Sequence, residues 1–210
     1  EGMVEEAKAK KEAGFATICG SFCSGMMEMG QTLRGFENMF MDIAGDEKMA
    51  EALFDKILEM KLKYWGIILP KIKDYALVAY ESEDLGVQTG CMISPASYRK
   101  LLKPRQKKLF SFIKSQAPDI KIFLHSCGSV YELLPDLIEV GLDILNPVQC
   151  SAAGMSPSEL KNKFGRRITF WGGGVDTQKT LPFGTPDDVR REVRERIDIF
   201  GQGGGFIFNP

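Results

Sequence analysis

The stretch that decides the fold is "IKIFLHSCGSVYELLPDLIEVGLDILNPVQ", residues 120–149. Two apolar runs, residues 120–127 and 142–149, flank a segment with helical periodicity over residues 129–141. Runs that are apolar nearly throughout are typical of strands buried on both faces of a parallel sheet. A strand, a helix and a second strand in this order predict a βαβ unit with a right-handed crossover.

The same alternation continues on both sides of this unit. Further strand-like runs lie at residues 15–22, 75–82, 168–175 and 205–210, and further helical patterns at residues 45–72, 94–116, 156–165 and 185–201. No linker or repeat divides the chain, so we expect one α/β domain over residues 1–210. Two architectures fit, an open doubly wound sheet and a (β/α)8 barrel. No G-x-G-x-x-G motif follows the first strand, which leaves dinucleotide binding little support.

Polar or reactive residues follow the carboxyl ends of these strands. They are Glu81, Asp84, His125, Cys127, Asn146, Gln149, Asp176 and Asn209. Function gathered at the carboxyl ends of many strands is typical of the barrel, because all of those ends meet on one face. We therefore predict a barrel in which these residues line one cavity. Six strands are visible in the sequence, two fewer than a complete barrel has.

The only histidine of the chain lies two residues before a cysteine. Residues i and i+2 of a strand point to the same face, so His125 and Cys127 can be directed at one point. Imidazole and thiolate are natural zinc ligands, and zinc needs further ligands for a tetrahedral site. Glu81 and Cys150, from the ends of the flanking strands, are the candidates. The alternative is a hydrogen-bonded core histidine beside a small buried cysteine.

The order of motifs resembles the uroporphyrinogen decarboxylase-like superfamily. The motifs are "ESEDLG" at residues 81–86, the stretch at residues 123–149, "WGGGVDTQ" at residues 171–178 and "GFIFNP" at residues 205–210. The resemblance runs from about Phe15 to Pro210 and is most specific over residues 123–149. It implies a (β/α)8 barrel that is incomplete here, with strands three to eight in this chain.

The resemblance also implies a function. The superfamily contains uroporphyrinogen decarboxylases and zinc-dependent, corrinoid-linked methyltransferases. The methyltransferases carry a His-x-Cys pair, which His125 and Cys127 match, and a later cysteine expected just beyond the eighth strand, where this chain ends. The expected reaction moves a methyl group between a corrinoid on a partner protein and a zinc-activated thiol or similar acceptor. Glu81 or Asp84 would take the released proton or occupy the zinc when substrate is absent.

In that interpretation, substrate contacts come from Asn146, Gln149, Asp176 and Asn209, and Cys150 is the third metal ligand within the sequence. The first alternative is metal-free decarboxylation of a porphyrinogen in haem biosynthesis. That chemistry needs cationic groups for several substrate carboxylates. The strand ends offer almost no Arg or Lys, and the Arg-rich N-terminal segment that decarboxylases use is not in this sequence. The second alternative is a degenerate barrel that binds a corrinoid or a metabolite.

Composition sets the remaining bounds. The formal net charge of −1 gives no reason to expect a nucleic-acid partner. No apolar run nears the roughly 18–20 residues that span a bilayer, so we expect no membrane segment. Five cysteines at irregular spacing favour a reducing compartment, hence the cytoplasm. Cys19 and Cys23 are expected to be structural, and the Met-rich residues 25–41 to be core. The start at Glu1 and the end in a strand lead us to expect a fragment of a longer chain.

Overall fold

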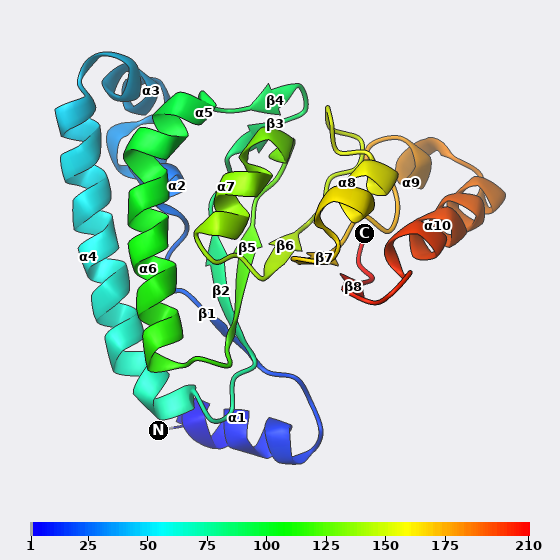
Figure 1. The fold of residues 1–210 in the computed structure, drawn as a ribbon, viewed down its shortest axis with the longest axis horizontal. Coiled ribbons are helices and arrows are strands. Elements are labelled where there is room, and N and C mark those ends of the chain that lie inside the picture. Colours follow the sequence, from blue (N-terminus) through cyan, green and yellow to red (C-terminus); the bar gives the residue numbers. More distant parts are fainter. Residues whose placement is uncertain (1) are drawn as a thin grey trace.

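A six-stranded parallel sheet forms the centre of the molecule (Figure 1). The structure is a computed structural model that describes residues 2–210. The strands are β1 (Ile18–Gly20), β2 (Val78–Ser82), β5 (Lys121–His125), β6 (Ile144–Asn146), β7 (Thr169–Trp171) and β8 (Phe206–Ile207). They lie in the order β1-β2-β5-β6-β7-β8, and every neighbouring pair is parallel. All six strands predicted from the sequence are therefore present.

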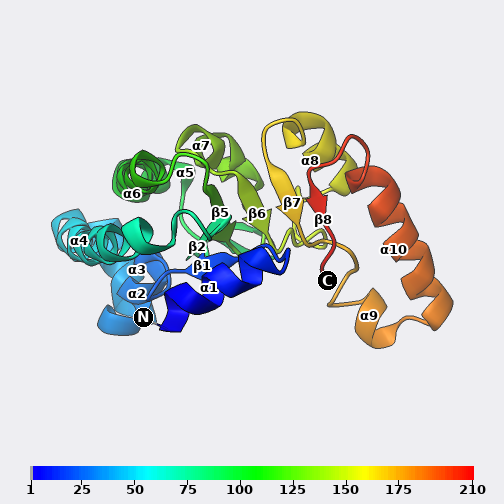
Figure 2. The same ribbon diagram turned by 90° about the horizontal axis from the view of Figure 1, so that it is seen from below.

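The strand order separates the two predicted architectures. A doubly wound sheet reverses its order at a switch point, whereas this sheet follows the sequence from one edge to the other. In the view from below, the helices form an outer arc around the strands (Figure 2). The barrel prediction is confirmed in the form of a partial barrel. Within residues 2–210, β1 and β8 are the two edges of the sheet and do not pair with each other.

The helices of the outer arc lie where the sequence periodicity predicts them. They are α4 (Glu47–Ile72), α6 (Lys103–Gln116), α7 (Leu134–Glu139), α8 (Pro157–Phe164) and α10 (Pro186–Phe200). Helix α4 starts after Asp46, whose side chain accepts a hydrogen bond of 3.3 Å from the Met49 amide, as expected for an N-cap. Among residues 2–210, no helix combines the length and the apolar character needed to cross a bilayer.

Pro104 distorts the helical segment at residues 94–116. The segment begins as the short helix α5 (Pro95–Ser97), widens into a π-helical turn at Tyr98–Leu102 and continues as α6. Proline has no amide hydrogen, and its ring clashes with the carbonyl four residues earlier. The wider turn before Pro104 is the place where the helix absorbs that clash. A 3₁₀ turn at Tyr131–Leu133 likewise leads into α7.

Alternate side chains of each strand face either the helix layer or the concave side of the sheet. The side chains that face the helices belong to the main core and are at most 1% exposed at Ala79, Leu124, Leu145 and Phe170. The side chains that face the concave side form a separate small cluster of Val78, Phe123 and Ile144, with Tyr80 and Trp171 packed against it. The period of two along a strand therefore decides whether a polar residue reaches the helix layer or the concave face.

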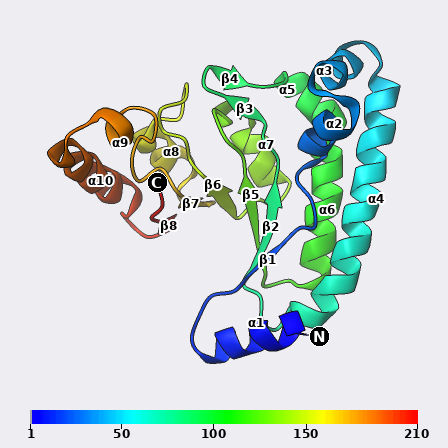
Figure 3. The ribbon, with the colours of Figure 1, turned by 180° about the vertical axis from the view of Figure 1, so that it is seen from behind.

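Six elements were not predicted individually. They are α1 (Gly2–Glu12), α2 (Met26–Arg34), α3 (Phe36–Gly45), the antiparallel pair β3 (Gly86–Val87) and β4 (Gly90–Cys91), and α9 (Thr180–Phe183). The Met-rich stretch forms α2 and α3, and its core prediction is confirmed for Met26, Met27 and Met39, which are at most 1% exposed. Met41 in the same stretch is 63% exposed. Figure 3 shows β3 and β4 at one end of the sheet and α1 at the other.

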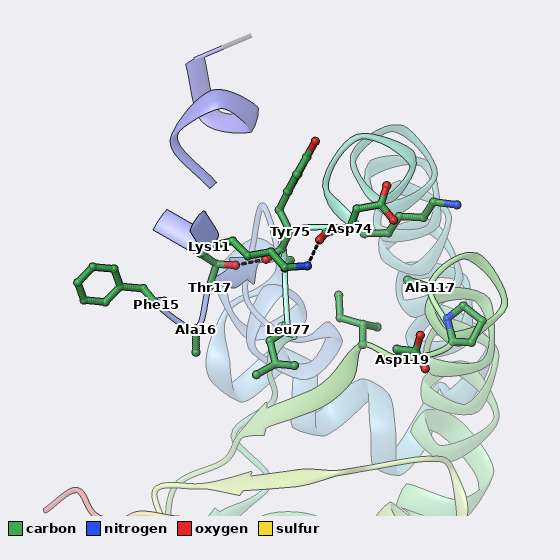
Figure 4. A pocket seen from close by; sticks show the side chains of 13 residues that line it. Lys11, Phe15, Ala16, Thr17, Asp74, Tyr75, Leu77, Ala117 and Asp119 are labelled. Atoms are coloured by element: carbon green, nitrogen blue, oxygen red, sulfur yellow. Dashed lines mark hydrogen bonds between the residues drawn. The ribbon is translucent and has the colours of Figure 1, made fainter. Parts of the chain in front are cut away.

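A cavity of about 600 Å³ lies at the amino ends of β1, β2 and β5 (Figure 4). Two of its polar side chains bond to the backbone of the protein: Lys11 donates to the carbonyl of Asp74, and Thr17 donates to the carbonyl of Tyr75. In barrels, catalytic groups gather at the opposite, carboxyl end of the strands. The functional site is therefore expected at the carboxyl ends of the strands.

Candidate metal centre

Three half-buried side chains come together at the carboxyl ends of β2 and β5. One ligand atom each from Asp84, His125 and Cys127 lies within 4.8 Å of the other two. His125 ends β5, and Cys127 follows it on the same face, with its Sγ 3.4 Å from His125 Nε2. Asp84 comes from the loop after β2, and the Cys127 amide donates to its Oδ1 at 2.8 Å. Carboxylate oxygen, imidazole nitrogen and thiolate sulfur are all zinc ligands, so these residues fit the metal that the resemblance implies.

Two glycines hold the Asp84 loop against the Cys127 loop. A Cβ added to Gly128 would lie 2.4 Å from the carbonyl carbon of Gly86, and one added to Gly86 would lie 2.7 Å from the carbonyl oxygen of Cys127. The Ser129 amide also donates to the Val87 carbonyl at 2.9 Å. Only residues without a side chain let the two backbones approach this closely. The contact therefore sets the distance between Asp84 and Cys127.

The Gly128→Ala substitution is expected to lower the free energy of unfolding by about 2–5 kcal/mol, because a left-handed backbone and a backbone clash add together. Gly128 has φ +73° and Gly203 has φ +70°, but nothing lies within 4 Å of a Cβ at Gly203. Gly203→Ala is therefore the matched control and should cost only about 1–2 kcal/mol. Urea unfolding measures both variants. Equal losses would contradict the proposed contact between the two loops.

Asn146 sets the orientation and tautomer of His125. Its Nδ2 donates to the Trp171 carbonyl at 2.8 Å, which directs its Oδ1 toward His125. His125 Nδ1 lies 2.7 Å from that oxygen, so Nδ1 must carry the proton. The lone pair then remains on Nε2, the nitrogen beside Cys127. Metal-binding histidines typically donate their second ring N–H to such an acceptor, which fixes the ring and strengthens the ligand.

The Cys127 thiol keeps its proton when no metal is present. Burial raises the pKa of the thiol above its usual 9.0, and the negative charge of Asp84 and a hydrogen bond to it raise that pKa further. A bound cation reverses this preference, because a coordinated thiol loses its proton outright. Binding of a metal at this candidate centre would therefore be coupled to release of the Cys127 proton.

Zinc binding at about pH 7.5 is expected to release about one proton for each zinc bound, since the raised pKa keeps Cys127 protonated beforehand. Calorimetric titrations in two buffers with different ionisation enthalpies give the number of protons released. The Cys127→Ala variant should release none from this position. Wild-type protein that binds zinc without proton release would show that Cys127 is not a ligand.

Glu81 lies on the other side of the sheet from the metal centre, which corrects the sequence interpretation. Its neighbours Tyr80 and Ser82 face the concave side, so the alternation of the strand directs Glu81 toward α4. There it accepts from Lys61 Nζ at 2.6 Å and from Trp65 Nε1 at 2.6 Å, and it is 2% exposed. Glu81 is a buried ion-pair partner and does not reach the candidate site.

Cys150 also lies outside the triad. Its Sγ bonds to the carbonyl of Val148 at 3.3 Å and faces the carbonyl of Gly173 at 3.9 Å. Burial raises the pKa of Cys150 to about 11. In the candidate triad, Asp84 therefore takes the place that the sequence analysis gave to Cys150. The reason is local: three residues separate Cys150 from the end of β6, and the turn they form directs its side chain toward the loop after β7.

Of the residues predicted to line one cavity, Cys127, Gln149 and Asp176 do share a cavity of about 180 Å³ beside the triad, whereas Glu81, Asp84, His125, Asn146 and Asn209 are not part of its lining. Cys127, Gln149, Cys150, Asp176 and Pro210 are among the residues that line it. Gln149 accepts from the Gly128 amide at 2.9 Å, and Asp176 accepts from the amides of Gln178 and Lys179 at 2.8 and 3.1 Å. Asn209 contributes its carbonyl to the Gly174 amide. The cavity thus joins Cys127 to the ends of β6, β7 and β8.

Sequence reasoning missed two polar residues beside the triad. Ser82 is the register partner of His125 on the neighbouring strand, and its hydroxyl donates to Glu28 at 2.9 Å. The two-residue period of β2 could have revealed Ser82, because Tyr80 and Ser82 share a face. Glu28 had no such signal, since it lies on α2, 54 residues from Ser82 in the sequence.

The parallel sheet forms part of a barrel wall, and candidate nitrogen, oxygen and sulfur ligands lie at the carboxyl ends of its strands. The chain is therefore an α/β protein of the barrel type with a candidate metal centre. A family model for uroporphyrinogen decarboxylase (URO-D) matches residues 6–210. The chain belongs to the uroporphyrinogen decarboxylase family.

Two known proteins are similar to this chain, one in sequence and one in structure. A uroporphyrinogen decarboxylase from Parasynechococcus marenigrum (strain WH8102) is 30% identical over 122 residues, which are 55% of this chain and 32% of the relative. A methyltransferase from Methanosarcina mazei is similar in structure, with a TM-score of 0.71 at 20% identity, over 98% of this chain and 56% of that protein. The chain thus spans about half of the methyltransferase. This structural similarity supports the fold alone.

Proposed function

We propose that the chain is part of a methyltransferase that moves a methyl group between a corrinoid on a partner protein and a zinc-activated thiol. The observation that carries this proposal is the triad of Asp84, His125 and Cys127 at the carboxyl ends of the strands. A metal-free decarboxylase has no need of a thiol and an imidazole nitrogen directed at one point. The structural similarity to a methyltransferase is consistent with the proposal.

Each residue of the centre has a distinct role in this proposal. When bound, zinc would lower the pKa of a substrate thiol and hold it as a thiolate. Asp84, His125 and Cys127 would be its protein ligands, and Asn146 would keep Nε2 of His125 free for the metal. The Cys127 amide donates to Oδ1 of Asp84. Asp84 would occupy the zinc when substrate is absent and would accept the proton of the thiol that displaces it. The methylated corrinoid would supply the methyl group without its bonding electron pair, which stays on cobalt.

Decarboxylation of a porphyrinogen is the second candidate, and the similarity to the uroporphyrinogen decarboxylase from Parasynechococcus marenigrum favours it. That reaction requires cationic groups for the carboxylates of the substrate. The residues that line the cavity beside Cys127 include no Lys or Arg. A further candidate, a non-catalytic binder of a corrinoid or metabolite, shares the triad but predicts no turnover. The methyl-transfer proposal gives the ligand set a role, which the decarboxylase does not, and predicts turnover, which the binder does not.

The test is methyl transfer by the full-length, zinc-loaded protein. Methylated corrinoid and a small thiol are the substrates, and mass spectrometry detects the S-methyl product while absorbance follows the corrinoid. We expect product with wild type and with Cys23→Ala, a control that removes a thiol outside the centre, and none with Cys127→Ala. Release of CO2 from uroporphyrinogen, with no S-methyl product, would overturn the proposal in favour of the decarboxylase.

A further inference from the structure

We infer that Glu192 on α10 is a positioning residue for the cavity beside the candidate metal centre, and that it acts through the loop after β7. The inference rests on the proposed function, because it assigns a further role at that same site. Three features of the described residues carry it: the bond from this loop to Glu192, the arrangement of the ion pair between Glu192 and Arg196, and the close packing of the start of the loop.

Asp176 connects the wall of the cavity to the helices outside it. Asp176 and Cys127 both line the cavity. The Asp176 amide donates to Glu192 Oε1 at 3.1 Å, and the Asp176 carbonyl accepts from the Leu181 amide at 2.9 Å. Helix α10, which carries Glu192, packs against α8 and α9 (Figure 1). A backbone hydrogen bond therefore ties the cavity wall to α10.

The ion pair of Glu192 is arranged around the Asp176 amide. One oxygen, Oε1, accepts from that amide and also from Arg196 at 2.7 Å. The side chains of Glu192 and Arg196 are only 12% and 14% exposed. Glu192 Oε2 and Arg196 Nε are buried and have no partner among residues 2–210. Unpartnered buried polar atoms are costly, and a pair that served α10 alone would avoid them with a bidentate bond. The geometry of the pair therefore favours the loop over the pair itself.

Close packing fixes the other end of the same loop. Gly172 has φ +120°, and a Cβ at this position would lie 1.9 Å from the Pro147 carbonyl oxygen. Only a residue without a side chain allows this approach. The loop is thus held at its start by backbone packing and further along by the bond from Asp176 to Glu192. Loss of Glu192 would free the end that carries Asp176 while the glycine end stays in place.

The charges of the pair also act on a second side chain of the cavity. Cys150 is part of the lining. Burial raises the pKa of Cys150 to about 11, the charge of Arg196 opposes this rise, and the charges of Glu192 and Asp176 add to it. The pair on α10 therefore lies close to the cavity, although it is not part of the lining.

The test is steady-state methyl transfer by the full-length, zinc-loaded protein, with saturating methylated corrinoid and 2-mercaptoethanol as the varied thiol. Glu192→Ala should raise KM for the thiol about tenfold and leave kcat and zinc affinity within about twofold of wild type, because the wall moves and the metal ligands do not. Glu192→Gln keeps an acceptor for the Asp176 amide and should restore most of the affinity. Glu195→Ala, the control, removes an equal charge from an exposed position on α10 and should leave KM unchanged.

Hydrogen exchange of single amides, followed by NMR, examines the bond itself. The Asp176 amide should exchange about tenfold or more faster in Glu192→Ala than in wild type, and Glu192→Gln should restore its protection. The Leu124 amide in β5 should keep its wild-type rate in both variants. A loss of global stability would instead accelerate both amides.

The outcomes separate this inference from the proposed function. An unchanged KM in Glu192→Ala, no recovery in Glu192→Gln, or an Asp176 amide that exchanges no faster would overturn the inference while methyl transfer by wild type stands. Equal acceleration at Asp176 and Leu124 would show a purely structural role and would overturn it as well. Wild-type protein that transfers no methyl group would overturn the proposed function together with the inference.

Discussion

Replacing Glu81 with alanine should lower the free energy of unfolding by about 3–5 kcal/mol, because it leaves a buried ammonium group without its charged partner. Lys61 and Glu81 have side chains that are 1% and 3% exposed and a charge-to-charge distance of 2.6 Å. The second oxygen of Glu81 is also the acceptor for Trp65 Nε1 at 2.6 Å. Urea unfolding monitored by circular dichroism measures the change.

Two further variants identify the cause of this loss. Glu81→Gln keeps an acceptor for Trp65 and should be less destabilising than Glu81→Ala. The double variant Lys61→Met with Glu81→Gln removes both charges and should recover part of the loss, since no buried charge is left unpaired. Zinc affinity should remain at the wild-type level in Glu81→Gln. A Glu81→Ala protein within about 1 kcal/mol of wild type would contradict the buried ion pair.

Removal of any one member of the triad should lower zinc affinity by about 100-fold or more. Structural zinc sites gain about 10–16 kcal/mol in total, so one of four ligands is worth roughly 3 kcal/mol, and 1.4 kcal/mol corresponds to a factor of ten. The variants are His125→Ala, Cys127→Ala and Asp84→Asn. Competition with a chromogenic chelator measures their affinities. A variant that retains wild-type affinity would show that its residue is not a ligand.

Neighbouring residues provide the graded controls for that experiment. Asn146→Ala should lower zinc affinity by about 10–100-fold, because it removes the acceptor that holds His125 Nδ1. Cys150→Ala should change the affinity by less than about threefold, because its Sγ is directed at backbone carbonyls instead of the triad. A larger loss in Cys150→Ala than in Asp84→Asn would restore Cys150 as the third ligand.

The parts of this account that sequence predicted correctly depend on local periodicity. Apolar runs and helical spacing predicted all six strands of the sheet and the helices of its outer arc. The two-residue period of a strand likewise predicted that His125 and Cys127 share a face, and their Sγ and Nε2 lie 3.4 Å apart. Asp84 was predicted as a strand-end residue, and the structure brings it to the same point.

The parts that sequence did not predict depend on contacts between distant segments. Glu81 bonds to Lys61, 20 residues away, and no local pattern distinguishes that bond from a place in the active site. Glu28 reaches Ser82 over 54 residues through the packing of α2. Cys150 follows the strand β6, but the conformation of the turn decides where its thiol points. A position near a strand end was therefore enough to propose a site residue. The direction of its side chain, which depends on distant contacts, decides whether that residue reaches the site.

The most direct test of the central claim is X-ray absorption at the zinc edge of the zinc-loaded protein. The account predicts a sulfur ligand at about 2.3 Å together with imidazole nitrogen at about 2.0–2.1 Å. The number of sulfur ligands should fall by one in Cys127→Ala and stay constant in Cys150→Ala, and the imidazole signal should disappear in His125→Ala. A zinc environment that is identical in wild type, Cys127→Ala and His125→Ala would contradict the claim that these residues hold the metal.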